Sequence, residues 1–442
     1  MTSSQASGAL RRTLGLSQAT AIGLGTMVGA GIFVFPGLAA GHAGPAAMIS
    51  FALGGIVALL VALPVSELAT AMPVSGGPAV YVARTMGPLW GTIVGVAQWI
   101  GLLFASAFYL VGFARYALDL LERVGLGADF SPGLVGVVMG VLVTAVNLAG
   151  SKKAGDLQNV IVGALLFILT LLLGYGALRT IGTVGNHELP ESFLPYGVKS
   201  VFTTAALVFT SYLGFAQIAT VSGSVRDPGR NVPLAMVGSV IVVTLLYVLT
   251  IFVATGCLPS EKLGDLGETA MIEVARSLLG RTGAIAIVAA GLLATLSSAN
   301  ASILSGSRAV YALGTEGLAP NGVTSVTNES RVPYVSLLLA GGPVAALTLL
   351  GRVEVLAEVA SFLHLALYGM LCVTLILLRR RSPEWYAPTF RSPGYPFIPI
   401  AGAVASCAVI AFMQPLSLLI GGIVVAASVV WYFRYSFQRG NE

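Results

Sequence analysis

The chain has 442 residues, of which 56% are hydrophobic and only 9% are charged. Because a soluble globular domain carries about 25% charged residues, this composition excludes an ordinary soluble protein and indicates several membrane spans. The net charge of +5 is spread between apolar runs, so no nucleic-acid partner is expected. The three cysteines lie in or beside apolar runs, which predicts neither a disulfide framework nor a metal centre.

The first apolar run follows a polar tail, residues 1–16, and is longer than the core of a signal peptide. We therefore expect an uncleaved first span. Its segment Gly23–Gly37 holds five glycines and one proline in fifteen residues. Since each glycine inside a helix costs about 1 kcal/mol relative to alanine, an unbroken helix is unfavourable here.

Open backbone at membrane depth persists only where it lines a cavity. The segment thus predicts a helix that opens around Gly29, Ala30 and Gly31. The positive end of the second half-helix would face the gap and suit a carboxylate. The alternative is a patch of small residues that lets two unbroken helices pack closely.

Twelve apolar runs have roughly the length of a membrane span. If the N-terminus is inside, fifteen of the 23 basic residues fall on the cytoplasmic side and eight on the other. This bias predicts a multi-pass protein of the plasma or inner membrane with both termini in the cytoplasm. The runs are 17–40, 46–72, 89–121, 132–149, 157–180, 200–224, 233–258, 283–313, 334–351, 354–379, 396–415 and 416–435.

The first ten runs repeat with a nearly constant offset of 183 to 202 residues. Residues 17–180 and 200–379 thus form two units of five spans, and an odd number of spans turns the second unit upside down. Residues 396–435 supply spans eleven and twelve, and 436–442 form a cytoplasmic tail. The repeat predicts that span six is interrupted like span one, near the glycine of Phe209–Gln217.

Five segments resemble the amino acid–polyamine–organocation (APC) superfamily of permeases. The resemblance runs almost from end to end and implies an all-α, LeuT-like membrane fold with a five-plus-five inverted repeat and two further C-terminal helices. The segments are Gly29-Ala-Gly-Ile-Phe, Glu67-Leu-Ala with Met72-Pro-Val-Ser-Gly-Gly77, Val225-Arg-Asp-Pro-Gly-Arg-Asn-Val-Pro233, Ser307-Arg-Ala-Val-Tyr-Ala-Leu-Gly-Thr-Glu-Gly-Leu-Ala-Pro320 and Phe390-Arg-Ser-Pro-Gly-Tyr-Pro396.

The same resemblance implies that spans one and six hold an amino acid by its main-chain groups. Span one would bind the carboxylate, and the carbonyls at the span-six break would bind the ammonium group. Other side chains from spans six and eight would line the substrate side-chain pocket. The residues implied are Met27, Gly29, Ala30, Gly31, Thr210, Tyr212, Leu213, Ala216 and Ser302.

One departure from the resemblance bears on the substrate. Many relatives carry a carboxylate where this chain has Ala216. Because a buried cationic group needs a paired charge, a neutral, small or apolar amino acid is favoured over arginine, lysine or a polyamine.

A second departure bears on coupling. Proton-linked relatives often have a lysine in span five, where this chain has Leu165. The hydroxyls of Ser297 and Ser298 in span eight suit a sodium ion, with Ser298 the favoured ligand, but they also suit simple helix packing. Glu67 is either a proton carrier or half of a structural ion pair. His364 either titrates or is a neutral core residue.

The sequence thus predicts a secondary active transporter that moves a neutral amino acid by alternating access, coupled to protons or sodium. An exchanger, an exporter and a carrier of cationic amino acids or polyamines remain alternatives. A channel would need rings of carbonyls or charges, and an enzyme would need a catalytic cluster; neither pattern is present. No cofactor is expected, and the protein would act as a monomer or homodimer in the bilayer.

Overall fold

The computed structural model describes residues 14–72, 77–123, 125, 130–149, 154–182, 192–327 and 332–436. The side chains of residues 30, 154–159 and 436 are not described. Most of the two tails, 1–16 and 436–442, lies outside these ranges. In the described part the chain is helical apart from its connections, and one isolated bridge joins Leu14 to Val225.

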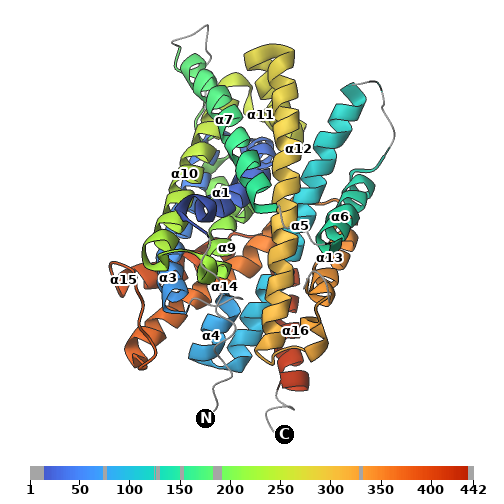
Figure 1. Cartoon of the computed structure of the whole chain (residues 1–442). Coiled ribbons are helices and arrows are strands. Elements are labelled where there is room, and N and C mark those ends of the chain that lie inside the picture. The colour runs from blue at the N-terminus through green and yellow to red at the C-terminus, as the bar shows by residue number, and fades with distance from the viewer. Residues whose placement is uncertain are drawn as a thin grey trace.

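Sixteen α-helices make up the described structure (Figure 1). Short 3₁₀ turns and one π turn join or extend them, among them Phe209–Tyr212 between α8 and α9. The helices are α1 (Leu16–Phe33), α2 (Phe35–Ala43), α3 (Ala47–Ala71), α4 (Pro78–Met86), α5 (Pro88–Arg123), α6 (Pro132–Ala149), α7 (Ala154–Thr180), α8 (Gly197–Val208), α9 (Gly214–Thr220), α10 (Pro228–Cys257), α11 (Ser260–Leu266), α12 (Ala270–Thr315), α13 (Tyr334–Leu349), α14 (Val353–Arg381), α15 (Phe397–Ile410) and α16 (Pro415–Trp431).

The residues at the helix ends explain where many of these helices begin and stop. Proline opens α5 and α16, where its missing amide proton leaves no helical hydrogen bond unmade. Gly44 ends α2 with a φ of +62°, and Gly87 follows α4 with a φ of +99°. Only glycine adopts these backbone angles readily.

Ten of the described helical segments are long and apolar enough to cross a membrane. Each of the twelve predicted runs contains a helix, but α13 and α15 have only 16 and 14 residues. A span normally needs about 20 residues, so the prediction of twelve full spans is not confirmed. The predicted run 17–40 is divided between α1 and α2, whereas α12 continues beyond the predicted run 283–313 in both directions.

Spans one and six are both interrupted, as predicted. In α1, Gly29 has φ −51° and ψ −122°, which breaks the helix. Span six consists of α8 and α9, joined by the 3₁₀ turn Phe209–Tyr212. The interruption at Gly29 coincides with the first glycine of the Gly29-Ala30-Gly31 segment. Gly29 and Gly31 also permit close packing, because an added Cβ atom would overlap the hydroxyls of Ser298 and Tyr247 respectively.

Span six lies at the centre of the bundle, and the last helix lies at its edge. The most apolar stretch of Gly197–Thr220 is 89% buried inside the protein, against 17% for Pro415–Tyr435. Figure 1 shows the long helices α5 and α12 side by side along the molecule, and they are in contact. Broken spans one and six also contact each other, through α1 and α9.

Contacts between the two predicted units are reciprocal. Span one of the first unit, α1, packs on span two of the second unit, α10. In the same way, span one of the second unit, α8, packs on span two of the first unit, α3. Likewise α5 contacts α14, and α12 contacts α7. A two-fold relation between the units would produce contacts of this kind.

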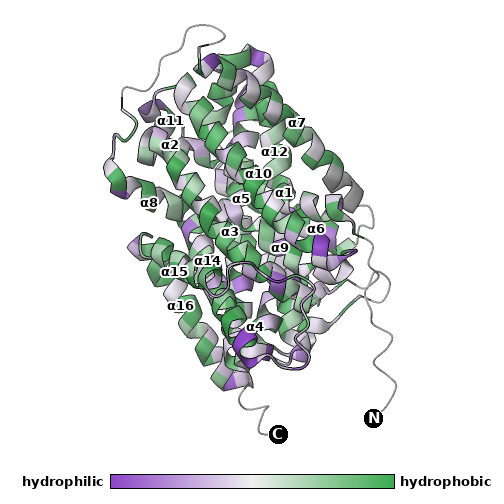
Figure 2. Ribbon diagram, turned by 90° about the vertical axis from the view of Figure 1, so that its left-hand side faces the viewer, coloured by the Kyte–Doolittle hydropathy of each residue, from purple (hydrophilic) through white to green (hydrophobic). Residues whose placement is uncertain are grey.

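Hydrophobic residues run along most of the length of the helices in Figure 2, and strongly hydrophilic ones lie beside α4 at one end. Ion pairs join helix ends there, as between Arg84 and Glu316. Other ion pairs, including Arg115 with Glu268, join segments elsewhere. Many apolar side chains on α6 and α7 are exposed, as expected for helices that face lipid.

The second half of span one, α2, is in close contact with the short helix α11 of the connection between α10 and α12. A Cβ atom added to Gly41 in α2 would lie 2.7 Å from the Cα atom of Gly264 in α11. A Cβ atom added to Gly37 would overlap the carbonyl of Gly267 and lie 2.8 Å from that of Leu263. Only glycines allow this approach, so α2 and α11 form one packed unit.

We expect Gly37→Ala to destabilise the protein by about 1–3 kcal/mol, because the new methyl group meets backbone atoms that cannot rotate away. The thermal unfolding midpoint of the detergent-purified protein measures this effect. Gly238→Ala in α10 is the matched control, since its Cβ atom would meet nothing within 4 Å. Equal midpoints for the two variants would contradict the close α2–α11 contact.

Candidate substrate site

The break in α1 is held by hydroxyl groups from two other helices. Ser298 Oγ of α12 lies 3.2 Å from the carbonyl oxygens of both Gly25 and Thr26, between which it shares its one proton. Tyr247 of α10 donates to the carbonyl of Met27. Residue 29 must be glycine here, because an added Cβ atom would overlap the Ser298 hydroxyl.

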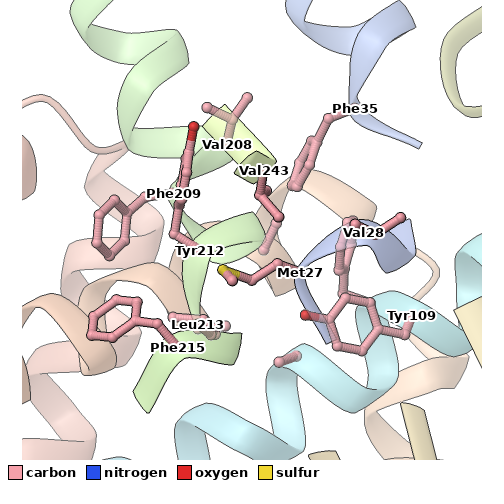
Figure 3. Close-up of a cluster of buried hydrophobic side chains, with 14 of the residues drawn as sticks. Met27, Val28, Phe35, Tyr109, Val208, Phe209, Tyr212, Leu213, Phe215 and Val243 are labelled. Carbon is pink, nitrogen blue, oxygen red and sulfur yellow. The ribbon is translucent and has the colours of Figure 1, made fainter. Parts of the chain in front are cut away.

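The hydroxyl of Tyr247 also binds the second break. It lies 3.0 Å from the carbonyl oxygen of Ser211, in the 3₁₀ turn between α8 and α9. A single side chain thus contacts the irregular backbone of both broken spans. Figure 3 shows the side chain of Met27 reaching from α1 toward Tyr212 and Leu213 of span six. Gly214 permits this approach, since an added Cβ atom would lie 2.7 Å from Met27 Cγ.

Several predicted substrate residues have their polar groups bound by the protein itself. Thr210 Oγ1 donates to the carbonyl of Ala357 at 3.0 Å, and the Tyr212 hydroxyl donates to the carbonyl of Phe51 at 2.7 Å. Ser302 is buried, and its hydroxyl has no partner among the described residues. The side chain of Ala30 lies outside the described part of the structure.

A small pocket lies beside the start of α9, and its cavity volume of about 10 Å³ is close to the space that one water molecule occupies. Of the predicted substrate residues, Leu213 and Ala216 line it, and the coupling candidate His364 lies there as well. The others, from Met27 to Gly31 together with Thr210, Tyr212 and Ser302, do not. The full lining is Pro78, Gln98, Leu102, Leu213, Ala216, Gln217, Thr220, Ser305, His364, Leu367 and Tyr368.

Sequence reasoning gave no role to several of these lining residues. Gln217 directly follows Ala216, and Ser305 lies one helical turn beyond Ser302 on α12. The spacing of i to i+3 places Ser302 and Ser305 on neighbouring positions of one helix face, which was the only signal available for Ser305. Which of the two serines borders the pocket depends on the rotation of α12, and a sequence does not specify that rotation.

The coupling candidate Glu67 is half of a buried ion pair, the structural alternative of the two proposed from the sequence. Its carboxylate is 0% exposed and accepts from Arg379 Nε at 2.8 Å and from Arg379 Nη2 at 2.5 Å. The backbone amide of Ser392 donates to it at 2.7 Å, and the hydroxyl of Tyr386 also donates. This network joins α3, α14 and the 382–396 connection.

The remaining coupling candidates are all buried. Ser298 Oγ and the carbonyl oxygens of Gly25 and Thr26 bring three oxygen atoms together. Ser297 and Leu165 are both buried, and Leu165 is in α7. Among the described residues, no three His, Cys, Asp or Glu side chains gather where they could hold a metal ion. The three oxygen atoms at the α1 break belong to a hydroxyl and two carbonyls and are uncharged.

Comparison with known proteins assigns the family. Residues 14–434 match the sequence profile of the amino acid permease family. The chain belongs to this family of membrane transporters. The resemblance to the APC superfamily is thereby confirmed, and so is the prediction that the protein is not an enzyme, because this family and the curated relatives consist of transporters.

Curated relatives cover nearly the whole permease. A methylthioribose transporter of Bacillus subtilis is 29% identical, over 97% of this chain and 94% of the relative. The branched-chain amino acid permease BcaP of the same organism is 26% identical, over 98% and 94%. Its serine/threonine exchanger SteT is 24% identical, over 90% of each chain. The permease is thus a multi-pass membrane protein of a family that transports amino acids.

We expect Glu67→Ala to destabilise the permease by roughly 3–5 kcal/mol, because removal of one partner leaves the other charge of a buried pair uncompensated. The double variant Glu67→Ala with Arg379→Met should recover much of this loss, since no unpaired charge remains. Thermal unfolding in detergent measures both variants.

As a matched control, Glu273→Ala breaks an exposed pair with Arg276 and should change stability by at most about 1 kcal/mol. A Glu67→Ala midpoint equal to the control's would refute the structural role.

Proposed function

We propose that this permease is a secondary active transporter that moves a neutral amino acid across the plasma membrane by alternating access. One observation carries the proposal: two interrupted spans, α1 and α8–α9, contact each other at the centre of a protein from the amino acid permease family. Paired interrupted spans characterise the midplane binding sites of secondary transporters.

The backbone at the two breaks has the polarity needed for amino acid main-chain groups. Beyond Gly29 the helix resumes and continues through Val34, which keeps helical angles (φ −98°, ψ −44°), into α2. The amides at the start of this second half-helix, around Ala30 and Gly31, lie at the positive end of its dipole and would suit a carboxylate. The carbonyl end of α8, near Thr210 and Ser211, has the opposite polarity and suits an ammonium group.

The substrate side chain would extend toward Leu213 and Ala216, which line the pocket beside α9. None of the described residues around this pocket is an Asp, Glu, Lys or Arg. A charged side chain would lose its hydration there without gaining a counter-ion. This supports a neutral amino acid over a cationic amino acid or a polyamine.

We further propose that the chain consists of two inverted five-span units, 17–180 and 200–379, followed by two helices. The reciprocal contacts of α1 with α10 and of α8 with α3 support this relation. Alternating access would then rock one group of helices against the other around the two breaks. The excess of basic residues on one side supports cytoplasmic termini.

The relatives also bear on the substrate. BcaP and SteT are named for branched-chain amino acids and for serine and threonine, which are neutral amino acids. The methylthioribose transporter is named for a substrate that is not an amino acid. This compound therefore belongs in any test of binding.

We expect neutral amino acids to raise the unfolding temperature of the purified permease, because a ligand at 100 times its dissociation constant stabilises the folded state by about 2.7 kcal/mol. Thermal unfolding against the twenty amino acids, common polyamines and methylthioribose measures this stabilisation. A shift with lysine, arginine or polyamines alone would contradict the neutral pocket. A shift with methylthioribose and with no amino acid would contradict amino acid transport.

Ser298 is the candidate ligand for a coupling ion, because its hydroxyl oxygen lies 3.2 Å from two carbonyl oxygens of span one. We propose that these three oxygens bind a sodium ion during transport. Replacement of sodium by choline should then depress uptake into proteoliposomes, and Ser298→Ala should make uptake insensitive to the exchange. Thr250→Val is a matched control, because Thr250 is buried and its hydroxyl binds only the carbonyl of Leu246 in its own helix. Equal wild-type uptake in both salts would exclude sodium and leave proton coupling or amino acid exchange.

A further inference from the structure

The pocket beside α9 contains two buried amide side chains whose hydrogen-bonding capacity is not used. Gln98 of α5 is 6% exposed, and its Oε1 atom has no partner among the described residues. Gln217 of α9 is 5% exposed, and its Nε2 atom likewise has none. Both side chains line the pocket. Since buried polar atoms in folded proteins are nearly always paired with protein or ordered water, these two atoms are available to a polar group of a ligand.

The other end of the Gln217 amide is already bound. Its Oε1 atom lies 3.1 Å from Thr26 Oγ1, and Thr26 Oγ1 lies 3.0 Å from the carbonyl oxygen of Ile22. The Thr26 hydroxyl has only one proton. If that proton points to Gln217, the amide oxygen of Gln217 accepts it. If the proton points to the carbonyl of Ile22, the amide nitrogen of Gln217 donates to Thr26 instead. In both orientations one polar atom of Gln217 binds span one, and the other is left for the pocket.

His364 lines the same pocket and adds a further acceptor. Its Nδ1 atom lies 2.8 Å from the carbonyl oxygen of Ala360. Because a carbonyl only accepts, Nδ1 carries the ring proton, and Nε2 of the neutral imidazole is an acceptor. Ser305 supplies a hydroxyl to the same lining. The lining therefore offers both acceptors and donors, all of them uncharged.

This set of groups discriminates between three kinds of ligand. A charged group would find no counter-ion among the described lining residues, and burial without one is strongly unfavourable. A purely apolar group would leave the amides of Gln98 and Gln217 unpaired, which is also unfavourable. A hydroxyl or a carboxamide both donates and accepts, so it satisfies both amides at once.

We propose that the pocket selects substrates with an uncharged polar side chain, a hydroxyl or a carboxamide, and that Gln98 and Gln217 determine this specificity. The inference rests on the proposed function, since the amino acid main chain must first be held at the two helix breaks. Among neutral amino acids, the inference favours those with a polar side chain. Ala216 alone suggests the opposite preference, for a small or apolar side chain. Gln217 additionally couples the substrate to span one through Thr26.

Affinities of isosteric amino acid pairs for the wild-type permease test the proposal. Threonine and valine have the same shape and differ by a hydroxyl, and asparagine and leucine are similarly matched for a carboxamide. We expect the polar member of at least one pair to bind about tenfold more tightly or better, because a site built to hydrogen-bond a substrate group discriminates against an analogue that lacks it. Titration calorimetry of the detergent-purified full chain measures the dissociation constants.

Gln98→Leu and Gln217→Leu remove the amides at nearly constant volume. Each should bring the affinity ratio of the pair toward one, while the affinity for alanine, which has no side-chain polar group, changes little. Thr204→Val is the matched control, because Thr204 of α8 has a buried hydroxyl without a partner among the described residues but does not line the pocket. This variant should keep the wild-type ratio.

The outcomes separate this inference from the proposed function. If valine and leucine bind as tightly as their polar counterparts in the wild type, the inference is overturned while neutral amino acid transport stands. The inference is also overturned if the wild-type affinity ratio between polar and apolar partners is unchanged in both Gln98→Leu and Gln217→Leu. If no amino acid binds at all, both proposals fail. The wild-type comparison needs no variant, so it decides even if a substituted protein does not fold.

Discussion

In the hydrocarbon core of a membrane no water is available to bind a free carbonyl or amide. The breaks at Gly29 and at Phe209–Tyr212 release such groups in the middle of the bundle. Hydroxyls from intact neighbouring helices bind several of the carbonyls: Ser298 at Gly25 and Thr26, Tyr247 at Met27 and Ser211, and Tyr116 at Phe33. The broken helices are thus possible only because α5, α10 and α12 surround them.

This dependence links the scaffold to transport. A hydroxyl that binds a carbonyl from another helix can be replaced by a substrate ammonium group or a cation at a small difference in free energy, because one hydrogen bond or ion contact substitutes for another. A carbonyl inside a regular helix offers no such exchange, since its partner is fixed by the helix. The hydrogen bonds from Tyr247 and Ser298 therefore lie where ligand binding can alter contacts between spans without breaking a helix.

The sequence predicted some features well because a local cause produces them. The break in α1 follows from glycine content, and the break in span six follows from the repeat. Contacts distant in sequence could not be predicted. The pairing of Glu67 with Arg379 joins residues 312 positions apart, and the sequence left it as one of two alternatives. The lengths of α13 and α15, 16 and 14 residues, also could not be predicted, because hydropathy reports the length of an apolar run and not where its helix ends.

The pocket illustrates the same limit at the level of single atoms. Ala216 predicts a neutral lining, because the absence of a carboxylate can be read from residue identity, and none of the described lining residues is an Asp, Glu, Lys or Arg. That Gln98 and Gln217 retain unpaired amide atoms depends on the rotations of α5 and α9 and on Thr26, which occupies one end of Gln217. Residue identity gives the hydrogen-bonding capacity of a side chain, whereas only the fold determines how much of that capacity remains for a ligand. In the proposed site, specificity would accordingly depend on groups that the fold leaves unsatisfied.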